Sequence, residues 1–589
     1  MSDTPFVLID DHLGGRSLLF ENPREIVVCG DPSAWREALG RIERGISAGL
    51  HAAGFLSYEL GYALEPVLAP LMPEERQAPL LWFGLFDAPR SLQAEEMKQW
   101  LGSGAYRLDG LRTSIGEDRY AHDFRRVLAY IAAGDIYQAN YTLRYTFDFE
   151  GDPLALYAEL RRRQRVAHGG YIRTGTHDIL SLSPELFFRK QGQRITGKPM
   201  KGTAPRAPTL GEDRGIAAEL ARDEKSRAEN LMIVDLIRND FARLAETGSV
   251  KVPELFAVET YRTLHQMTST VEARLKPGTS ILDLVRALFP CGSITGAPKI
   301  RAMQIIRELE AGPRDVYTGS IGYFAPDGSA HFNVAIRTIT LRDGKGIMGI
   351  GSGLVADSDL QSEWRECLLK GDFLTRRQEP FLLFETMRWE PEDGYVLLGE
   401  HLDRLRQSAD YFLYPYPAAE IEAVLRRAAE GFPRVPQRVR LTLSEHGEAA
   451  ATHAALPTAG NAAPWRFVLS EHRTSPGDPY LFHKTTRREL YDAEFAHATG
   501  EGRADEVVFL NTRDELTEGS RTNLFLEIDG RLLTPPLSSG LLPGTLRRSL
   551  IKNGAVEERI LRREDLGRAE RIFLGNSVRG LVEAELQEA

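Results

Sequence analysis

The sequence predicts a mixed α/β fold of the α+β kind, because strand-like runs and helical patterns are interleaved along the first 375 residues. Runs such as "REIVVCG", "LLWFGLFD" and "HDILSLSPELFFRK" have the length and composition of strands. Between such runs, apolar residues recur at helical spacing, most clearly over residues 213–245, where we expect one long helix. With 589 residues, the chain is long enough for two to four domains.

A domain boundary is predicted where this pattern restarts. A helical segment ends in "LTRRQEP", and a new strand, "FLLFETMRW", is followed by a new helix, "EHLDRLRQSADYF". We therefore predict a first domain over residues 1–375, a linker over 376–380 and a second domain over 381–589. The linker is short and charged, so we expect the domains to be docked. The Ala/Gly-rich stretch 447–463 is expected to be a mobile surface loop.

Composition excludes several classes of partner. The net charge of −10 argues against a nucleic-acid or anionic-membrane surface, although it leaves room for a local basic pocket. The three cysteines, Cys29, Cys291 and Cys367, are too few and too widely spaced for a disulfide framework or a cysteine metal site. The N-terminus has no targeting pattern, and no apolar run is long enough to cross a membrane. We expect a cytoplasmic protein.

One group of candidate residues centres on "ITGKPMKGTAPR", where Lys201 lies between Pro199 and Gly202 in a stretch typical of a rigid turn or of a strand that breaks into a turn. Glu185 precedes a strand, a turn and a second strand, and such a hairpin would bring it close to Lys201. A carboxyl group can transfer protons, and a desolvated lysine is nucleophilic near neutral pH. A surface ion pair is the alternative interpretation.

Further acidic residues extend this group. Glu229 lies in the predicted helix, and Glu363 and Glu366 are three residues apart, on one helix face. Two such helices could together hold Mg²⁺, which is usually bound by one or two protein carboxylates. The alternative is that each glutamate is a solvated surface charge, which is the commoner case for a single glutamate. The Gly-rich turn "CGSITGAPKIRAM" offers backbone N–H groups to an anion, and Arg337 lies in an apolar strand.

Together these segments resemble the chorismate-utilising enzymes, over residues 100–375. That family comprises anthranilate, aminodeoxychorismate, isochorismate and salicylate synthases, and the resemblance implies an α/β sandwich around an Mg²⁺-dependent chorismate site. Isochorismate-type members have a water-activating lysine where this chain has Gln138, which indicates ammonia as the nucleophile. Anthranilate synthases usually have Ala where this chain has Lys201, so the sequence looks like aminodeoxychorismate synthase component I, with anthranilate synthase as an alternative.

The resemblance also implies roles for individual residues. Lys201 would attack C2 of chorismate and expel the C4 hydroxyl with Glu185 as proton partner, and ammonia would then enter at C4. Gln266 stands where some members have a His, and His265 beside it is the candidate acid, because a Gln cannot donate a proton in this way. Glu229 and Glu366 would ligate Mg²⁺, with Glu363 close by. The implied substrate-binding residues are Gln138, Thr295, Gly296, Tyr323, Arg337, Gly353, Lys370 and Gln266.

The source of ammonia is predicted to be another protein. Glutamine hydrolysis needs a nucleophilic cysteine in a Gly-rich turn with a histidine, and none of the three cysteines has such a setting. We therefore expect a separate glutamine amidotransferase subunit.

A second group of candidate residues lies downstream. Lys484 follows a short apolar run in "LFHKTTRRELYDAEF", and Glu518 lies in a turn before a strand. The turns in "GLLPGTLRRSLI" and "RIFLGNSVRGL" could bind a phosphate. A lysine, a carboxylate and phosphate-binding turns are the parts of a pyridoxal phosphate site, while exposed surface charges are the alternative.

The order of these parts resembles the fold-type IV pyridoxal phosphate enzymes, over residues 381–589. That family includes aminodeoxychorismate lyase and the branched-chain and D-amino-acid aminotransferases. The resemblance implies that Lys484 forms the Schiff base, that Glu518 pairs with the pyridine nitrogen and that the domain forms a homodimer. The family's usual segment before "FETMR" is missing, so a non-catalytic module is the alternative. The implied phosphate-binding residues are Arg404, Thr545, Leu546, Asn576 and Ser577.

The two resemblances fit one pathway, because a lyase consumes what the synthase makes. The predicted function is conversion of chorismate to 4-amino-4-deoxychorismate and then, with loss of pyruvate, to 4-aminobenzoate, a folate precursor. A synthase with a non-catalytic second module is the alternative.

Overall fold

The computed structural model describes residues 4–375, 379–456, 464–500, 502 and 504–587. The chain forms two compact units, and each is considered by itself. The first comprises Met1–Ala204, Glu219–Tyr261 and His265–Gln378, and the second comprises Pro205–Ala218, Arg262–Leu264 and Glu379–Ala589. Both mix helices and strands, which confirms the predicted fold class. The boundary at 376–380 stays a prediction, since residues 376–378 lie outside the described residues.

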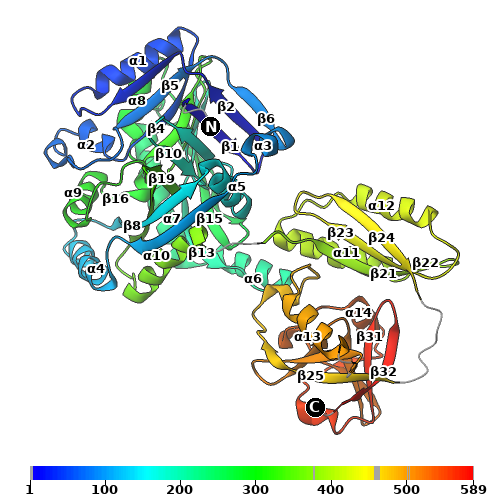
Figure 1. Ribbon diagram of the computed structural model, residues 1–589. Coiled ribbons are helices and arrows are strands. Elements are labelled where there is room, and N and C mark those ends of the chain that lie inside the picture. Colours follow the sequence, from blue (N-terminus) through cyan, green and yellow to red (C-terminus); the bar gives the residue numbers. More distant parts are fainter. Residues whose placement is uncertain (1–3, 376–378, 457–463, 501, 503, 588–589) are drawn as a thin grey trace. The chain divides into compact units, whose positions relative to one another are not determined.

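The first unit contains two ten-stranded sheets (Figure 1). In the first sheet neighbouring strands run antiparallel. Its strands, in order, are β16 (Gly296–Ala297), β8 (Gln138–Gly151), β20 (Lys345–Leu354), β19 (Thr338–Arg342), β10 (Asp178–Ser181), β9 (Gly169–Arg173), β1 (Phe6–Asp11), β2 (Arg16–Glu21) and β6 (Arg90–Gln93), and β7 (Tyr106–Thr113) pairs with β8.

The second sheet of this unit carries Lys201, which lies in a strand and not in a turn. Its β11 and β12 form the expected hairpin, with Leu186 opposite Lys198. Its strands, in order, are β13 (Met200–Pro205), β15 (Leu264–Arg274), β12 (Arg194–Lys198), β11 (Leu186–Gln191), β18 (Ala330–Asn333), β17 (Ser320–Phe324), β4 (His51–Leu56), β5 (Leu81–Phe86) and β3 (Glu25–Cys29), and β14 (Lys251–Thr260) pairs with β15.

The two sheets pack face to face. Val7 and Ile172 of the first sheet share a buried cluster with Phe55 and Ile321 of the second. Helices cover the outer faces, so the unit is a four-layer sandwich, and α1 and α8 lie side by side (Figure 1). The second sheet packs against α1 (Trp35–Ser47), α7 (Glu224–Ala242) and α8 (Ile281–Leu288), and the first sheet packs against α4 (Glu117–Ala132), α5 (Pro153–Arg163), α9 (Lys299–Leu309) and α10 (Leu360–Thr375).

The long helix predicted over 213–245 is wrong in one respect, because the segment forms two helices. These are α6 (Leu210–Leu220) and α7. The carboxylate of Asp223 accepts a hydrogen bond from the backbone N of Ser226 at 2.7 Å, which caps the start of α7. An N-cap residue has an extended backbone, so it ends the helical run that apolar spacing alone suggested.

The second unit begins with a four-stranded sheet in the order β22 (Gly394–Tyr395), β21 (Leu383–Glu390), β23 (Gln437–Leu443) and β24 (Ala449–Ala455). Helices α11 (Leu398–Phe412) and α12 (Ala418–Glu430) pack on it. The loop predicted over 447–463 is partly wrong, because β24 pairs with β23 along its whole length. Ala449 and Ala451 pack against the core, where small side chains suffice. Residues 457–463 lie outside the described residues.

An eight-stranded sheet completes the second unit. Strand β25 runs parallel to both of its neighbours, β26 and β32. Helices α13 (Glu489–Gly500) and α14 (Thr545–Lys552) belong to this part (Figure 1). Its strands, in order, are β27 (Leu516–Gly519), β26 (Glu506–Asn511), β25 (Trp465–Thr474), β32 (Gly580–Leu586), β31 (Arg571–Asn576), β28 (Asn523–Ile528), β29 (Arg531–Thr534) and β30 (Glu557–Glu558).

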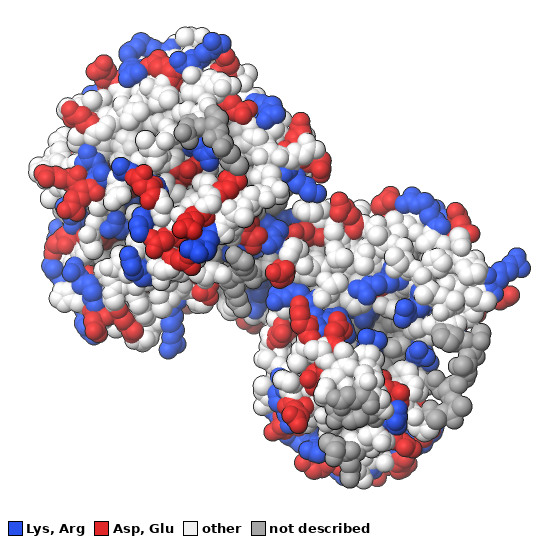
Figure 2. All heavy atoms as spheres, in the orientation of Figure 1, with Lys and Arg blue, Asp and Glu red and all other residues white. Residues whose placement is uncertain are grey.

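The surface carries both signs of charge. On the face shown in Figure 2, basic and acidic side chains are interspersed over the surface. Among the described residues, no helix is both long and apolar enough to cross a membrane.

Candidate functional site

The first candidate site forms around the side chain of Lys201. A Cβ atom added to Gly353 would lie 2.3 Å from Lys201 Nζ and 3.2 Å from Gln138 Nε2. These residues come from β13 of the second sheet and from β20 and β8 of the first. The lysine therefore reaches into the space between the sheets that the glycine leaves open.

Burial gives this lysine and Glu185 unusual proton affinities. Burial lowers the pKa of the Lys201 amine, an effect that the nearby carboxylate of Glu229 opposes. Burial also raises the pKa of Glu185 to about 7, although a hydrogen bond from Ser293 and the charge of Lys201 oppose the shift. Near neutral pH the carboxyl group can thus gain or lose a proton beside an amine that is easily deprotonated.

Several buried polar atoms at this site have no partner among the described residues. They are Oε1 of Glu185 and both terminal atoms of Gln138, Oε1 and Nε2. An unsatisfied buried polar atom costs about 1–3 kcal/mol, so such atoms are rarely left together without a ligand to pair with. Their grouping beside Lys201 indicates a site for a polar molecule.

Arg337 supplies a half-buried positive charge near Tyr261. It precedes β19 with a left-handed backbone (φ of 50°), and its backbone oxygen accepts from the N of Leu182 at 3.1 Å. Burial lowers the pKa of its guanidinium to about 10, opposed by Tyr261, whose own pKa is also affected by the charge of Glu185. A partly desolvated cation of this kind suits an anionic ligand.

The Gly-rich turn lies directly beneath Gln138. Gly296 has φ of 141°, and a Cβ atom there would lie 2.2 Å from the backbone oxygen of Gln138. The hydroxyl of Thr295 donates to the backbone oxygen of Cys291 at 2.9 Å, and the Thr295 oxygen accepts from the N of Asn140. Only glycine fits at position 296, because the strands approach so closely.

The three predicted metal ligands come near one another but do not form a metal-binding group. Burial raises the pKa of Glu229, and the negative charges of Glu363 and Glu366 add to that shift. Glu366 is paired with Lys370 at 2.7 Å, and Glu363 accepts from the hydroxyl of Ser358 at 2.8 Å. In the described part of the chain, no three His, Cys, Asp or Glu residues are grouped closely enough to hold a metal ion. Lys370, one turn after Glu366, is the ion-pair partner of that glutamate, and the roles of the three glutamates as Mg²⁺ ligands stay predictions.

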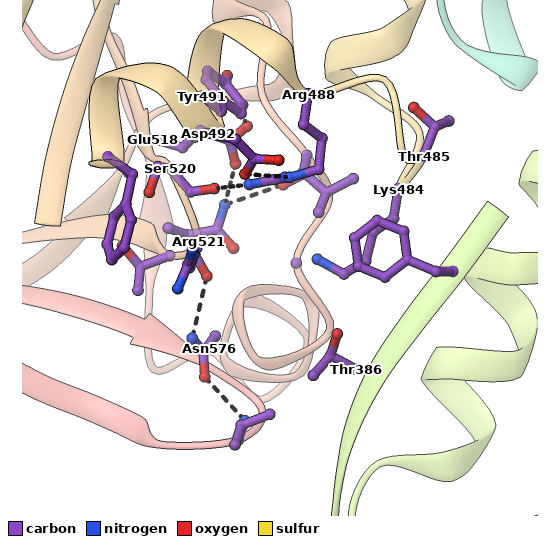
Figure 3. Close-up of a pocket in the computed structure, with 18 of the residues that line it drawn as sticks. Thr386, Lys484, Thr485, Arg488, Tyr491, Asp492, Glu518, Ser520, Arg521 and Asn576 are labelled. Atoms are coloured by element: carbon purple, nitrogen blue, oxygen red, sulfur yellow. Dashed lines mark hydrogen bonds and ion pairs between the residues drawn. The ribbon is translucent and has the colours of Figure 1, made fainter. Parts of the chain in front are cut away.

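The second candidate site is a cavity of about 1260 Å³ in the second unit. Figure 3 shows Lys484 and Thr386 on one side of it and Glu518, Ser520 and Arg521 on the other. The segment of Lys484 is tied to β21, because Phe384 N donates to Lys484 O at 3.0 Å and Thr486 N donates to Leu382 O at 2.9 Å.

The lysine and the glutamate of this cavity both have shifted pKa values. Burial lowers the pKa of Lys484 to about 7, aided by the positive charges of Arg404 and Arg488. Burial raises the pKa of Glu518 to about 7. The Glu518 carboxyl accepts from Tyr491 Oη and from Asn523 Nδ2, each at 3.2 Å. An unprotonated lysine amine can react with a carbonyl group, and a buried carboxyl that lacks a full charge partner suits a cationic ring nitrogen.

Arg404 belongs to a buried chain of polar contacts. Its Nε and Nη2 donate to the two oxygens of Glu385 at 2.9 and 2.5 Å, and Nδ1 of His401 lies 2.6 Å from the same carboxylate. The other ring nitrogen of His401 lies 3.3 Å from the hydroxyl of Thr545. Burial alone would raise the pKa of Glu385, but the charges of Arg404 and His401 outweigh it and hold the pKa at about 2.

The remaining predicted phosphate-binding residues lie around the same cavity. The side-chain oxygen of Asn576 accepts from the N atoms of Val578 and Arg579, both at 3.0 Å. Ser577 and Thr545 also line the cavity, and Leu546 follows Thr545 in the first turn of α14. The structure therefore brings the second group of predicted residues together.

Comparison with known proteins decides the family. Residues 21–376, more than half of the chain, match the chorismate binding enzyme family. The chain belongs to the chorismate binding enzymes. Residues 382–585 match amino-transferase class IV, so this chorismate binding enzyme carries a class IV domain as well.

Curated relatives match the first part. Aminodeoxychorismate synthase component 1 of Klebsiella aerogenes is 41% identical over 293 residues, which cover 50% of this chain and 62% of the relative. The protein of the same name from Salmonella typhimurium is 39% identical over 337 residues, covering 54% of this chain and 74% of the relative. Anthranilate synthase component I from Streptococcus pneumoniae has a similar structure, with a TM-score of 0.55 and 26% identity over 61% of this chain and 92% of that one.

One predicted substrate contact of this chorismate binding enzyme lies away from Lys201, and another is bonded to the strand of Lys201. Tyr323 is on β17, five strands from β13 in the sheet order, which is about 24 Å, and its ring stacks on His331. Gln266 Nε2 donates to Gly202 O at 2.8 Å, so its amide holds the strand of Lys201. His265, next along β15, points to the other face and lies 3.0 Å from the hydroxyl of Thr260.

Sequence reasoning missed several residues of both sites. In the first site, Ser293 forms a hydrogen bond with Glu185, and the charge of Glu185 affects the pKa of Tyr261. In the second, Glu385 and His401 position Arg404. Ser293 lies within the Gly-rich turn and Glu385 within "FETMR", so both were in segments already singled out, but neither has a spacing that marks it.

Proposed function

We propose that this chorismate binding enzyme makes 4-aminobenzoate from chorismate in two steps. The first unit aminates chorismate to 4-amino-4-deoxychorismate, and the second unit eliminates pyruvate from that product. The observation that carries the first step is the half-buried Lys201, which lies beside Gln138 at Gly353 and acts through its charge on the buried Glu185, with unpaired polar atoms on Gln138 and Glu185. The matching observation for the second step is the half-buried Lys484, which lines the same cavity as Glu518.

In the first step Lys201 is the nucleophile. Its unprotonated amine attacks C2, the ring double bonds shift, and the C4–O bond breaks while Glu185 donates its proton, so that water leaves. Ammonia then forms a bond to C4, the bond between C2 and Lys201 breaks, and the proton that ammonia gives up returns to Glu185. Arg337 and the backbone around Gly296 orient the carboxylates of chorismate.

The carboxylates at this site are of the kind that can bind Mg²⁺. Glu229 and Glu366 would hold it, with Glu363 close by, because Mg²⁺ needs only one or two protein carboxylates and takes its other ligands from water and substrate. The ion would supply positive charge for a substrate carboxylate. Lys370 would then have to release Glu366.

Pyridoxal phosphate fits the second site. When bound, it supplies an electron sink for the elimination. Lys484 would hold the cofactor and move the proton, and Glu518 would pair with the ring nitrogen. The phosphate group would be bound by Arg404, Thr545, Leu546, Asn576 and Ser577.

Two partners complete the proposal. A separate glutamine amidotransferase subunit supplies ammonia, which the name "component 1" of the relatives supports. The second unit forms a homodimer, as the resemblance to fold-type IV enzymes suggests.

Anthranilate synthase activity is the second candidate, favoured by the structural similarity to anthranilate synthase component I. The retained Lys201 disfavours it. Purified protein would be given chorismate, ammonium, Mg²⁺ and pyridoxal phosphate, and the products separated and identified by mass. We expect 4-aminobenzoate from the wild type, no aminated product from Lys201→Ala, and 4-amino-4-deoxychorismate alone from Lys484→Ala. Anthranilate as the sole product would overturn the proposal.

A further inference from the structure

One face of the four-stranded sheet carries two arginines toward the second cavity. On the other face, Leu383, Val439 and Leu441 pack against α11 and α12. Because side chains alternate along a strand, Phe384 and Thr386 of β21 and their neighbours on β23 must point away from those helices. Thr386 is directly opposite Arg440. Phe384, Thr386, Arg438 and Arg440 all line the cavity.

Arg440 lies close to the reactive lysine. Its guanidinium carbon is 4.2 Å from the centre of the Phe384 ring, and Lys484 Nζ is 4.8 Å from the same point. One aromatic ring thus contacts both cations, so the guanidinium carbon and the amine are at most about 9.0 Å apart.

The cavity is basic although the whole chain has a net charge of −10. Nine Lys and Arg side chains line it against six Asp and Glu. Five of the six acidic residues have a partner: Asp492 pairs with Arg488, Asp505 pairs with Arg466, and Glu506, Asp478 and Glu518 accept hydrogen bonds from Ser520, Tyr480 and Tyr491, respectively. Within the described ranges, no carboxylate pairs with Arg438 or Arg440, and no acceptor bonds to either side chain. Guanidinium groups left free in a cavity suit an anion, and their planar fork matches a carboxylate.

These two arginines are separate from the residues proposed for the phosphate. Arg404, Thr545 and Asn576 come from α11, α14 and the end of β31. Asn576 also donates to the backbone oxygen of Arg521 at 3.1 Å, which places Arg521 on that side of the cavity (Figure 3). The β23 arginines therefore offer positive charge beyond what the cofactor needs.

We propose that Arg438 and Arg440 form a carboxylate-binding subsite of the second cavity, which selects a ring-borne amine on a dicarboxylate over an α-amino acid. Alternate residues of a strand are about 6.6 Å apart, so the two guanidinium groups can each take a different carboxylate. A simple α-amino acid such as alanine has one carboxylate, fixed on the carbon that bears the amine, so it cannot place separate carboxylates on both arginines. The inference rests on the proposed function and names the substrate class of that site.

The test uses the full chain with pyridoxal phosphate bound. Arg440→Gln and Arg438→Gln are compared with Arg434→Gln, which removes an exposed arginine just before β23 that does not line the cavity. Conversion of 4-amino-4-deoxychorismate is followed at varied concentration, together with amine transfer from D- and L-alanine. Cofactor occupancy is measured by absorbance. In a second arm chorismate, a dicarboxylate without the amine, is titrated while the cofactor absorption band is followed, since that band reports only the second cavity.

We expect Arg440→Gln to raise KM for the dicarboxylate, and Kd for chorismate in the second arm, by about tenfold, with kcat, cofactor occupancy and alanine turnover changed less than twofold. Arg434→Gln should change none of these. If Arg440→Gln and Arg438→Gln behave like Arg434→Gln, or if they lower cofactor occupancy instead, the subsite is refuted. If the wild type does not convert 4-amino-4-deoxychorismate, the proposed second step fails, while the chorismate titration still decides the subsite.

Discussion

Lys201 Nζ lies where a side chain at position 353 would have to go, since a Cβ atom on Gly353 would be 2.3 Å away. The glycine of one sheet and the lysine of the other therefore depend on each other. The position of the reactive amine in the first site therefore depends on how the two sheets pack against each other in the folded chain.

Replacing Gly353 by alanine should remove the amination of chorismate. The added methyl group must displace the lysine amine, and a displacement of about 1 Å can cost about 100-fold in rate. Ammonium-dependent formation of 4-amino-4-deoxychorismate measures the effect. Gly211→Ala, at an exposed helical position with nothing within 4 Å, is the matched control and should keep full activity. Equal rates for both variants would contradict the assigned place of Lys201.

The amination rate should fall as the pH rises above about 7. Glu185 has a pKa raised to about 7, so it loses the proton that the leaving hydroxyl needs. Glu185→Gln should lower the rate by about 100-fold or more, because an amide cannot transfer the proton. The measurement is the pH dependence of kcat/KM with ammonium corrected for its own ionisation. An alkaline limb that stays unchanged in the variant would assign the titration to another group.

The same substitution should make the protein more stable at alkaline pH. A carboxyl group whose pKa is raised from 4.5 to about 7 on folding stabilises the fold fully below pH 4.5, and this contribution is lost as the pH rises through 7. At pH 8 the buried charge costs roughly 2–3 kcal/mol, which the neutral Gln avoids. Calorimetry should show a higher unfolding temperature for Glu185→Gln at pH 8 but not at pH 5. The exposed Glu74→Gln should show no such difference, and a variant less stable at pH 8 would contradict the shift.

Glu385→Gln should weaken both the fold of the second unit and cofactor binding. Removing one charge from a buried ion pair costs about 3–5 kcal/mol, because Arg404 is left without its partner. The pKa of Glu385 is held at about 2, so the wild-type pair contributes stability above pH 4.5 and loses it only as the pH falls through 2. Denaturant unfolding and the Kd of pyridoxal phosphate at pH 7 check this. Glu390→Gln, on the same strand, is the control and should change the stability by less than about 1 kcal/mol.

Incorporation of pyridoxal phosphate should accelerate up to about pH 7 and then level off. Only the unprotonated amine of Lys484 reacts with the cofactor, and its pKa is lowered to about 7. Arg488 contributes to that lowering, so Arg488→Met should move the whole profile to higher pH. Stopped-flow absorbance at fixed cofactor concentration measures the profile. A profile that Arg488→Met leaves in place would mean that its charge does not act on the lysine.

The sequence predicted the fold class and brought together the right lysines and carboxyl groups, because local patterns encode strands, turns and helix faces. Glu185 and Lys201 are linked by a hairpin, which is a short-range feature, and the structure shows that hairpin. The shared site of Lys484 and Glu518 was expected from the order of their segments, which resembles that of the fold-type IV enzymes, and both residues line the cavity. The assigned catalytic roles stay predictions.

What the sequence did not reveal depends on how its segments pack. The position of Tyr323, five strands from β13, cannot be deduced from residue type, whereas Glu366 and Lys370 pair within one helix. The cap at Asp223 and the pairing of β24 were also missed, since apolar spacing does not reveal where a helix is interrupted or which alanine-rich segment finds a partner strand. The role of His401 could not be predicted from the sequence, because it depends on simultaneous contacts with Glu385 and Thr545.

The two backbone hydrogen bonds that fasten residues 484–486 to β21 have a consequence for protein engineering. Through these bonds the four-stranded sheet positions Lys484. Other residues around the lysine, such as Glu518, belong to the eight-stranded sheet. A chimaera that exchanges only one of these sheets with a relative would therefore misalign the amine against its carboxylate even if every residue of the cavity were kept. Recombination between such proteins should be done at residues outside 382–587, so that both sheets are inherited together.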